Sequence, residues 1–347
     1  MSMRETSCLM KNVDGQVEMQ MNDAVGDLKP PIATAREDPS PSTKFSSKGR
    51  PTAAHKAWST LGFLLNLSFV SFPRGTRRCH VASFPPSDVW EWLRTKRKSV
   101  RGQVVVITGG GSGIGAAVAE RLALQHGARL ALIDVNENGV RQVAASIVAA
   151  AGEARPYVCD VSDEMSLAQT ADAIRRDMGH PDIVVCNAAV MFFGFFMELS
   201  SQQLRKAIDV NLIGAINTIR AFLAPMEERN SGQVVCISSI AGHVGDTYGL
   251  AYCPSKFALI GVMESLKWEL KDRGLDGIKC TTICPYFTRT PMVVSAGMRP
   301  TSTWFPFMST LTCSRLVVDA ILREDPHAFI PKYIRLVALL KMCVPID

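Results

Sequence analysis

A run of glycines near residue 110 has the spacing of a phosphate-binding turn. Residues 108–115 read Thr-Gly-Gly-Gly-Ser-Gly-Ile-Gly, between a β-branched run, 103–108, and a helical pattern, 114–126. Glycine allows a tight turn and close approach of the backbone to a pyrophosphate, and the first amides of a helix donate to phosphate oxygens. Glycine clusters also form ordinary loops, but the flanking strand and helix favour nucleotide binding. The residues expected at the cofactor are Gly109, Ser112, Gly113, Ile114 and Gly115.

An acidic residue at the end of the next strand indicates which dinucleotide binds. Asp134 stands 19 residues after Gly115 and closes the run 129–134. A carboxylate there accepts hydrogen bonds from the adenosine ribose and repels a 2′-phosphate. No basic residue stands at Ser112 or Val135, where a 2′-phosphate clamp would be expected. We therefore expect NAD rather than NADP, with an ordinary surface turn as the alternative role of Asp134.

A second acidic residue, Asp160, follows the strand-like run 154–159. It is expected at the carboxyl edge of the sheet, where ligands bind in this architecture. The alternative is that Asp160 caps the following helix, for which Asp163 would serve equally well.

Tyr252 and Lys256 stand four positions apart in Tyr-Cys-Pro-Ser-Lys, which would place both on one helix face. Ser239 lies thirteen residues upstream of Tyr252, at the carboxyl end of a predicted strand. The Tyr–Lys pair alone is weak evidence for a function. The fixed order of glycine turn, acid, serine and Tyr-x-x-x-Lys makes coincidence improbable.

Together these motifs resemble the short-chain dehydrogenase/reductase family over about residues 100–330. The matching segments are TGGGSGIG (108–115), Asp134, DV (160–161), NAA (187–189), Asn211, SSIAG (238–242), YCPSK (252–256) and CPYFTRTPM (284–292). The family usually has NAG where this chain has NAA, and Ala189 is a small change. The resemblance implies further cofactor contacts from Asp160, Val161, Asn187, Ala188, Tyr252, Lys256, Pro285 and Thr290.

The resemblance also implies how four residues would oxidise an alcohol. Tyr252 would be the general base, and Lys256 would lower its pKa from the ordinary value of about 10 and hold the nicotinamide ribose. Ser239 would hydrogen-bond the substrate oxygen. Asn211 would hold a water that links Lys256 to solvent, and its alternative role is that of a locally satisfied helix residue.

These residues need a scaffold that brings distant segments to one edge. Strand-like runs recur at 103–108, 129–134, 154–159, 183–186, 233–238 and 279–283, with helix-length segments between them. Near-continuous apolar strands that alternate with helices indicate a parallel sheet covered on both faces. The expected fold is therefore α/β, a doubly wound Rossmann sheet in a single domain over 101–330.

Segments outside this domain have a different composition. Residues 1–57 are polar and rich in Ser, Pro and Lys, so we expect a disordered leader. Residues 58–100 combine short apolar stretches with clustered Lys and Arg, which suits the interface of an anionic membrane. The apolar tail, 331–347, would either dock on a membrane or pack on the domain.

The basic stretch 96–100 refines the family resemblance. It is similar to the junction after the hydrophobic anchor in the membrane-associated group that contains 17-beta-hydroxysteroid dehydrogenase 11, retinol dehydrogenase 10 and epidermal retinol dehydrogenase 2. This implies the endoplasmic reticulum membrane or the lipid-droplet surface, with the active site facing the cytosol. A cytoplasmic location is the alternative. Family members commonly form homodimers.

Aromatic and methionine residues gather in two regions, 191–196 and 286–307. A pocket lined by such residues suits a lipophilic alcohol. The residues expected at the substrate are Phe192, Phe193, Tyr286, Met292 and, just past Ser239, His243. Plain core or a membrane-facing patch is the alternative.

Charge and cysteine content exclude other classes of protein. The net charge of +6 belongs to residues 1–100, which hold 15 Lys and Arg against 9 Asp and Glu, whereas 101–347 holds 23 of each. A neutral folded part does not fit a nucleic-acid binder. Ten dispersed cysteines without Cys-x-x-Cys pairs argue against a disulfide scaffold and a cysteine-built zinc site, so no metal is expected.

The function expected from sequence is NAD-dependent oxidation of a lipophilic alcohol, of the retinol or 17β-hydroxysteroid type, to its carbonyl. The alternatives are an NADPH-dependent carbonyl reductase and a non-catalytic, lipid-surface protein that binds a dinucleotide.

Overall fold

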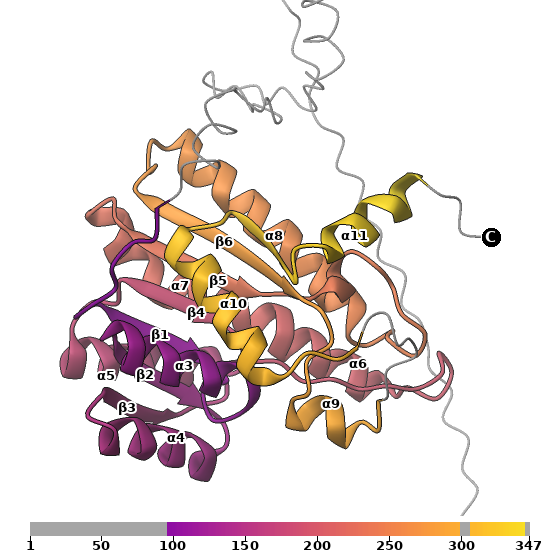
Figure 1. Cartoon of the computed structure of the whole chain (residues 1–347), viewed down its shortest axis with the longest axis horizontal. Coiled ribbons are helices and arrows are strands. Elements are labelled where there is room, and N and C mark those ends of the chain that lie inside the picture. The colour runs from indigo at the N-terminus through magenta and orange to yellow at the C-terminus, as the bar shows by residue number, and fades with distance from the viewer. Residues whose placement is uncertain (1–95, 299–305, 344–347) are drawn as a thin grey trace, which may run out of the picture. The chain divides into compact units, whose positions relative to one another are not determined.

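The computed structural model describes residues 96–298 and 306–343 (Figure 1). The expected leader, 1–57, nearly all of the expected membrane-proximal segment, 58–100, and the end of the tail, 344–347, lie outside the described residues.

Seven parallel strands form one sheet in the order β3-β2-β1-β4-β5-β6-β7. Their bounds are β1 Val104–Thr108, β2 Arg129–Asp134, β3 Glu153–Val158, β4 Ile183–Cys186, β5 Gly232–Ile237, β6 Ile278–Pro285 and β7 His327–Ile330. The winding direction reverses between β1 and β4, which creates a crevice at the carboxyl ends of these strands. The expected doubly wound α/β fold is confirmed, and β7 is a strand that the sequence patterns did not indicate.

Helices cover both faces of the sheet (Figure 1). One face packs against α3 (Gly113–His126), α4 (Glu137–Ala149) and α10 (Thr310–Arg323). The other packs against α5 (Glu164–Met178), α7 (Gly214–Glu228) and α8 (Cys253–Asp272). Successive side chains alternate between the two cores, so Val105 and Ile107 join one while Val104 and Val106 join the other. This is why the strands read as continuous apolar runs.

One helical stretch, 201–228, has the length and hydropathy of a membrane span. It comprises α6 (Ser201–Ile208), the π-helical turn η1 (Asp209–Ile213) and α7. Phe222 and Met226 on α7 are buried against the sheet. The stretch is therefore a core helix of the α/β fold.

The packed region begins shortly before the first strand. Val100 is buried in the core, and the amide of Lys98 donates to the carbonyl of Leu322 on α10 at 2.8 Å. The side chain of Arg97 pairs with Asp319, and that of Lys98 pairs with Glu324. Basic residues that were expected beside a membrane are thus ion-paired to α10.

The helix α11 (Ile334–Cys343) lies beyond the sheet and has two different faces. Ile334 and Ala338 are buried against Ile240, with Tyr286 and Phe329 packed nearby. Leu336, Leu339 and Leu340 are exposed. One face of the tail therefore packs on the domain while the other remains apolar and open.

Candidate active site

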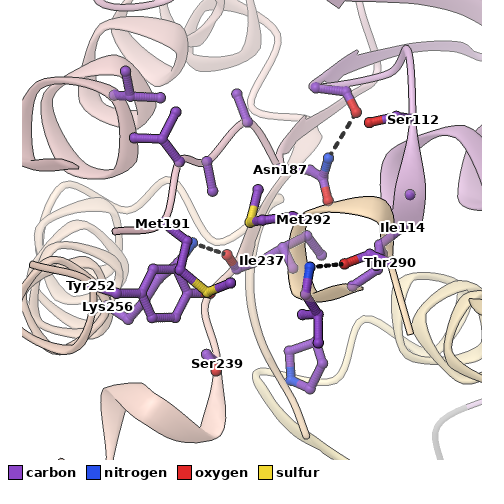
Figure 2. Close-up of a pocket in the computed structure, with 18 of the residues that line it drawn as sticks. Ser112, Ile114, Asn187, Met191, Ile237, Ser239, Tyr252, Lys256, Thr290 and Met292 are labelled. Carbon is purple, nitrogen blue, oxygen red and sulfur yellow. Dashed lines mark hydrogen bonds between the residues drawn. The ribbon is translucent and has the colours of Figure 1, made fainter. Parts of the chain in front are cut away.

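A pocket of about 410 Å³ opens at the carboxyl ends of β1, β4 and β5. Figure 2 shows Ser112, Ile114 and Thr290 at one side of it and Tyr252, Lys256 and Met191 at the other. This is the crevice created by the reversal of the sheet, which is where ligands bind in open parallel sheets.

The glycine turn can be built only from glycine at several positions. Gly109 and Gly113 have φ of +65° and +57°, a conformation that other residues rarely adopt. A Cβ atom on Gly115 would lie 2.1 Å from the carbonyl oxygen of Gly109. Gly115 does not line the pocket and instead allows α3 to pack closely on the end of β1.

The side chains of Asn187 and Thr108 support this turn through hydrogen bonds. The side-chain amide of Asn187 donates to the carbonyls of Thr108 and Gly109, both at 3.0 Å. The Thr108 hydroxyl accepts from the amides of Asn187 and Ala188. The expected supporting role of Asn187 therefore has a geometric basis in the structure.

The start of α3 is suited to bind phosphate. Its N-cap residue, Ser112, makes no side-chain cap, whereas the N-caps of α4, α5, α6 and α10 accept from backbone amides of their helices. The first amides of α3 are thus left for an anion, aided by the helix dipole. Together with the glycine turn, this end of the pocket fits a dinucleotide.

Asp134 lies beside the glycine turn in the wall of the pocket. Its carboxylate accepts from the amides of Gly111 at 2.8 Å and Asn136 at 2.9 Å. Val135 beside it is exposed and offers no positive charge. The carboxylate therefore both shapes the turn and lines the pocket.

Asp160 and Val161 also line the pocket. The Asp160 carboxylate accepts from the Ser162 amide and hydroxyl and pairs with Lys206 at 3.0 Å. Burial raises the pKa of Asp160, but these hydrogen bonds outweigh it and lower the pKa overall. The helix cap is Asp163, which accepts from two amides of α5, so the alternative role of Asp160 is wrong.

Ser239, Tyr252 and Lys256 come together at the opposite end of the pocket. The Ser239 side chain lies close enough to the Tyr252 phenol to lower its pKa. Tyr252 stands at the start of α8, and Lys256, one turn later, has its ammonium 5.5 Å from the centre of the Tyr252 ring. All three residues line this pocket.

The ammonium of Lys256 is not directed at the phenol. It donates to the carbonyl oxygen of Ile237 at 3.0 Å, and the residue is buried (Figure 2). Burial lowers the pKa of Lys256 to about 8. Burial also raises the pKa of Tyr252 above its ordinary value, and the nearby Ser239 side chain lowers this pKa by less. In the protein alone, Lys256 therefore does not produce the expected lowering of the Tyr252 pKa, because desolvation dominates.

Asn211 supports the site from the π-helical turn η1. Its side chain accepts from the Val190 amide at 2.7 Å, and donates to the Val190 carbonyl and to the hydroxyl of Ser255. Within the described residues these contacts connect the loop after β4 to α8, one residue before Lys256. Its expected water-holding role stays a prediction.

The substrate side of the pocket is apolar. Phe193, Tyr286 and Met292 line it as expected, with Met191, Phe287 and Val293. Phe192 does not line it and packs instead with Leu199, Ala207 and Ala251. His243 does not line it either and faces Cys284 and His327. Pro285 and Thr290 are lining residues, and Thr290 caps the short helix α9 (Pro291–Ser295).

Sequence reasoning missed two parts of the site. Lys206 lines the pocket beside Asp160, but no spacing links residues so far apart in the chain. The Ile237 carbonyl holds Lys256, and a backbone acceptor leaves no signal in residue type. Both are contacts made by the tertiary fold.

Comparison with known proteins identifies the class. A family model described as short chain dehydrogenase matches residues 103–299. A 17-beta-hydroxysteroid dehydrogenase 13 from Rattus norvegicus is 32% identical over 265 residues, covering 76% of this chain and 87% of the relative. An epidermal retinol dehydrogenase 2 from Mus musculus is 34% identical over 253 residues, covering 72% and 81%. A short-chain dehydrogenase/reductase from Burkholderia phymatum, solved in complex with NAD, has a TM-score of 0.65 at 25% identity and covers 72% of this chain and 98% of its own.

The chain therefore belongs to the short-chain dehydrogenase family. The expected resemblance to its hydroxysteroid and retinol dehydrogenases is confirmed. The protein is an oxidoreductase that acts on CH–OH donors with a nicotinamide dinucleotide.

Proposed function

We propose that this enzyme uses NAD to oxidise a lipophilic alcohol, of the retinol or 17β-hydroxysteroid type, to its carbonyl. The observation that carries the proposal is that Ser239, Tyr252 and the buried Lys256 line one end of a pocket whose other end is a glycine-built phosphate cradle.

Each of the three side chains has its own role in the proposed reaction. Ser239 holds the alcohol oxygen, and Tyr252 removes the hydroxyl proton as the carbonyl forms. The nicotinamide ring, when bound, accepts the hydrogen of the carbinol carbon together with its electron pair. Lys256, whose ammonium donates to the Ile237 carbonyl, would instead hold the ribose hydroxyls of a bound cofactor, and its charge would favour the ionised phenol.

The preference for NAD is supported by the surroundings of Asp134. Its carboxylate lies in the pocket wall, and the neighbouring side chain is an exposed valine. A 2′-phosphate would meet a negative charge there without a cation to hold it.

The lipophilic substrate is supported by the lining residues and by the relatives. Met191, Phe193, Tyr286 and Phe287 present apolar surface beside Tyr252. Relatives that cover most of this chain are named as hydroxysteroid and retinol dehydrogenases. Both kinds of alcohol present one hydroxyl on a large apolar body, which matches one polar corner in an apolar pocket.

A location at the endoplasmic reticulum membrane or the lipid-droplet surface, with the pocket open to the cytosol, agrees with this substrate. Phe195, Phe196 and Met197 are exposed after the loop that lines the pocket. The exposed leucines of α11 lie on a helix whose other face packs near Tyr286. Apolar surface beside a pocket for lipids marks a membrane contact.

The test is a panel of retinoid, steroid and long-chain alcohols, and their carbonyls, each with NAD and NADP. We expect oxidation with NAD, and a Tyr252→Phe variant that loses about 10²- to 10⁴-fold in turnover while it still binds NADH. A preference for NADPH and carbonyls would instead support the reductase. Absence of turnover with the whole panel would support the non-catalytic alternative.

A further inference from the structure

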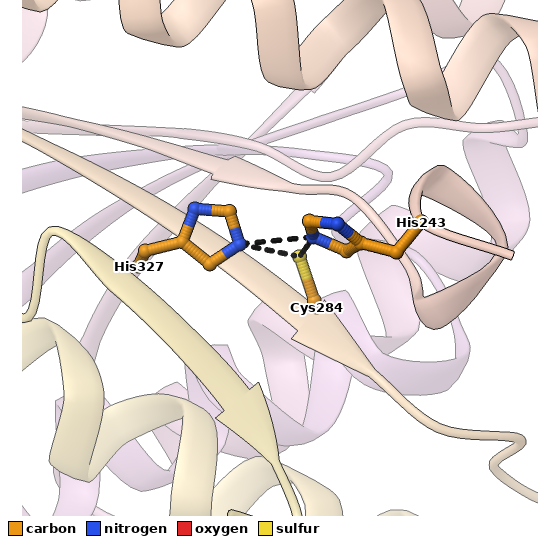
Figure 3. Close-up of side chains that lie close together, drawn as sticks. All are labelled: His243, Cys284 and His327. Carbon is orange, nitrogen blue, oxygen red and sulfur yellow. Dashed lines mark hydrogen bonds between the residues drawn. The ribbon is translucent and has the colours of Figure 1, made fainter. Parts of the chain in front are cut away.

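Three potential metal ligands from separate elements converge outside the substrate pocket. His243 follows the 3₁₀ turn η2 (Ile240–Gly242), Cys284 lies in β6 and His327 opens β7 (Figure 3). The two imidazoles point toward each other above the sulfur atom. None of the three side chains has a role in the proposed oxidation.

The ligand atoms form a compact triangle. The Nε2 atoms of His243 and His327 are 3.0 Å apart, and the Cys284 Sγ lies 3.6 Å from each. Zinc lies about 2.05 Å from imidazole nitrogen and about 2.3 Å from thiolate sulfur. At tetrahedral angles this requires about 3.3 Å between nitrogens and about 3.6 Å between nitrogen and sulfur. The triangle therefore matches three corners of a zinc site to within a few tenths of an ångström.

We propose that His243, Cys284 and His327 bind a zinc ion with an open fourth coordination position. Two imidazoles and one thiolate form a donor set that suits this borderline-soft ion. On binding, the S–H bond of Cys284 breaks, a Zn–S bond forms, and the proton leaves to solvent. No change of oxidation state is involved.

The surroundings hold the ligands in place and leave a route for the ion. Cys284 is fully buried in β6, whereas both histidines are partly exposed. The Phe329 ring lies 4.9 Å from the His243 ring and 5.0 Å from the His327 ring, so an apolar side chain limits their movement. The fourth ligand would be a water on the open side.

Nearby positive charges lower the affinity of the site for zinc. Arg335 and Lys267 lie close enough to act on His327, and Lys256 acts on Cys284. A zinc ion with one thiolate carries a net charge of +1, so these cations weaken its binding.

The site adjoins the active site at the backbone of Ser239. The Ser239 amide lies close enough to the Cys284 sulfur to favour its thiolate form. A metal ion on this sulfur would therefore lie beside the residue that holds the substrate oxygen.

The sequence gives no spacing signal for this site. The cysteine is separated from the two histidines by 41 and 43 residues, far from any metal-binding repeat. The expectation that no metal binds rested on the lack of Cys-x-x-Cys pairs, which does not test a site assembled from three elements.

Cobalt binding tests the proposal directly. Full-length protein, freed of metal with a chelator and kept reduced, is titrated with Co²⁺, whose thiolate complexes have an intense near-ultraviolet charge-transfer band. We expect the band to saturate at one equivalent, with one proton released per ion, and Zn²⁺ to displace the cobalt. The readout requires no substrate, so it stands whether or not the protein oxidises an alcohol.

Substitution of each proposed ligand tests which side chains bind the metal ion. Cys284→Ser should abolish the band, and His243→Gln and His327→Gln should each weaken cobalt binding by about 100-fold or more, since even outer-shell partners carry about 10- to 100-fold. Cys280→Ser and His180→Gln are matched controls and should bind normally. If Cys284→Ser does not fold, the two histidine variants decide. A wild-type protein without the band, or a band that survives in the histidine variants, overturns the proposal and leaves a hydrogen-bonded cluster.

Discussion

Lys256 is a charged side chain that is almost completely buried. It is only 2% exposed, and its ammonium has a single carbonyl partner among the hydrogen bonds of the described residues. Burial lowers the pKa of Lys256 from 10.5 to about 8, which means that the folded state binds this proton less tightly than the unfolded state. The fold thus carries a stability cost for a group that serves the reaction in the proposed mechanism.

Replacing Lys256 with methionine should therefore stabilise the fold while it abolishes turnover. The shift in pKa corresponds to about 3 kcal/mol, and loss of the hydrogen bond to Ile237 offsets about 1 kcal/mol of this. The cost is present in full below pH 8 and is relieved as pH rises from 8 toward 10.5, because only the unfolded state keeps the proton there. Urea unfolding should show a gain of about 2 kcal/mol at pH 7 and a smaller one at pH 9.5. A variant less stable than wild type at pH 7 would contradict this account.

Tyr252 should give the rate a characteristic dependence on pH. Burial raises the pKa of its phenol, and oxidation needs the ionised form, so oxidation should speed up with rising pH while reduction slows. With NAD bound, the positive nicotinamide should lower this pKa. The midpoint of kcat/KM for the alcohol at saturating NAD should lie below that of the free phenol, measured as the ultraviolet difference between wild type and Tyr252→Phe. Equal midpoints would exclude this effect of the cofactor charge.

At the level of elements, the turn from β1 to α3 tolerates no added atom at Gly115. A Cβ there would meet the Gly109 backbone, which cannot move without displacing the turn. Gly115→Ala should lower the free energy of unfolding by about 1–3 kcal/mol. NADH binding, measured by fluorescence, should weaken at least tenfold, which needs a loss of only about 1.4 kcal/mol.

Gly261→Ala is the matched control for this substitution. Gly261 lies in α8 with open space around its missing Cβ. Alanine should stabilise the helix by about 0.5–1 kcal/mol and leave NADH binding unchanged. Similar losses in both variants would show that the tight contact at Gly115 is not the cause.

The elements that carry the site were predictable because their signals are local. The strands at 129–134 and 183–186 have the expected bounds, and the helix expected at 114–126 begins at Gly113. By contrast, β7 has only two buried residues, Ala328 and Ile330, and its place is decided by pairing with β6. The metal-ligand triangle and the Lys206–Asp160 pair arise from long-range packing, so no pattern in the chain indicates them.

At the level of the whole molecule, the proposed membrane contact makes α11 a docking surface. Leu336, Leu339 and Leu340 are each at least half exposed, and burying the exposed part of each in lipid would contribute about 1 kcal/mol. Changing all three to serine should weaken binding of the full chain to anionic vesicles or to oil droplets at least tenfold in a flotation assay.

Leu311 provides the control for this prediction. It is 69% exposed at the start of α10, so Leu311→Ser removes a similar apolar side chain from another element. Flotation should be unchanged in this variant. If the triple variant also floats normally, α11 is not the surface that binds lipid.

The position of Thr290 bears on the order in which the cofactor and the alcohol bind. This residue caps α9, in the segment that walls the substrate side, and its methyl group would lie 3.4 Å from a Cβ on Gly113 at the start of the phosphate cradle. The proposed dinucleotide site thus borders that wall. We expect a compulsory sequence, in which NAD arrives first, the alcohol second, and NADH departs last.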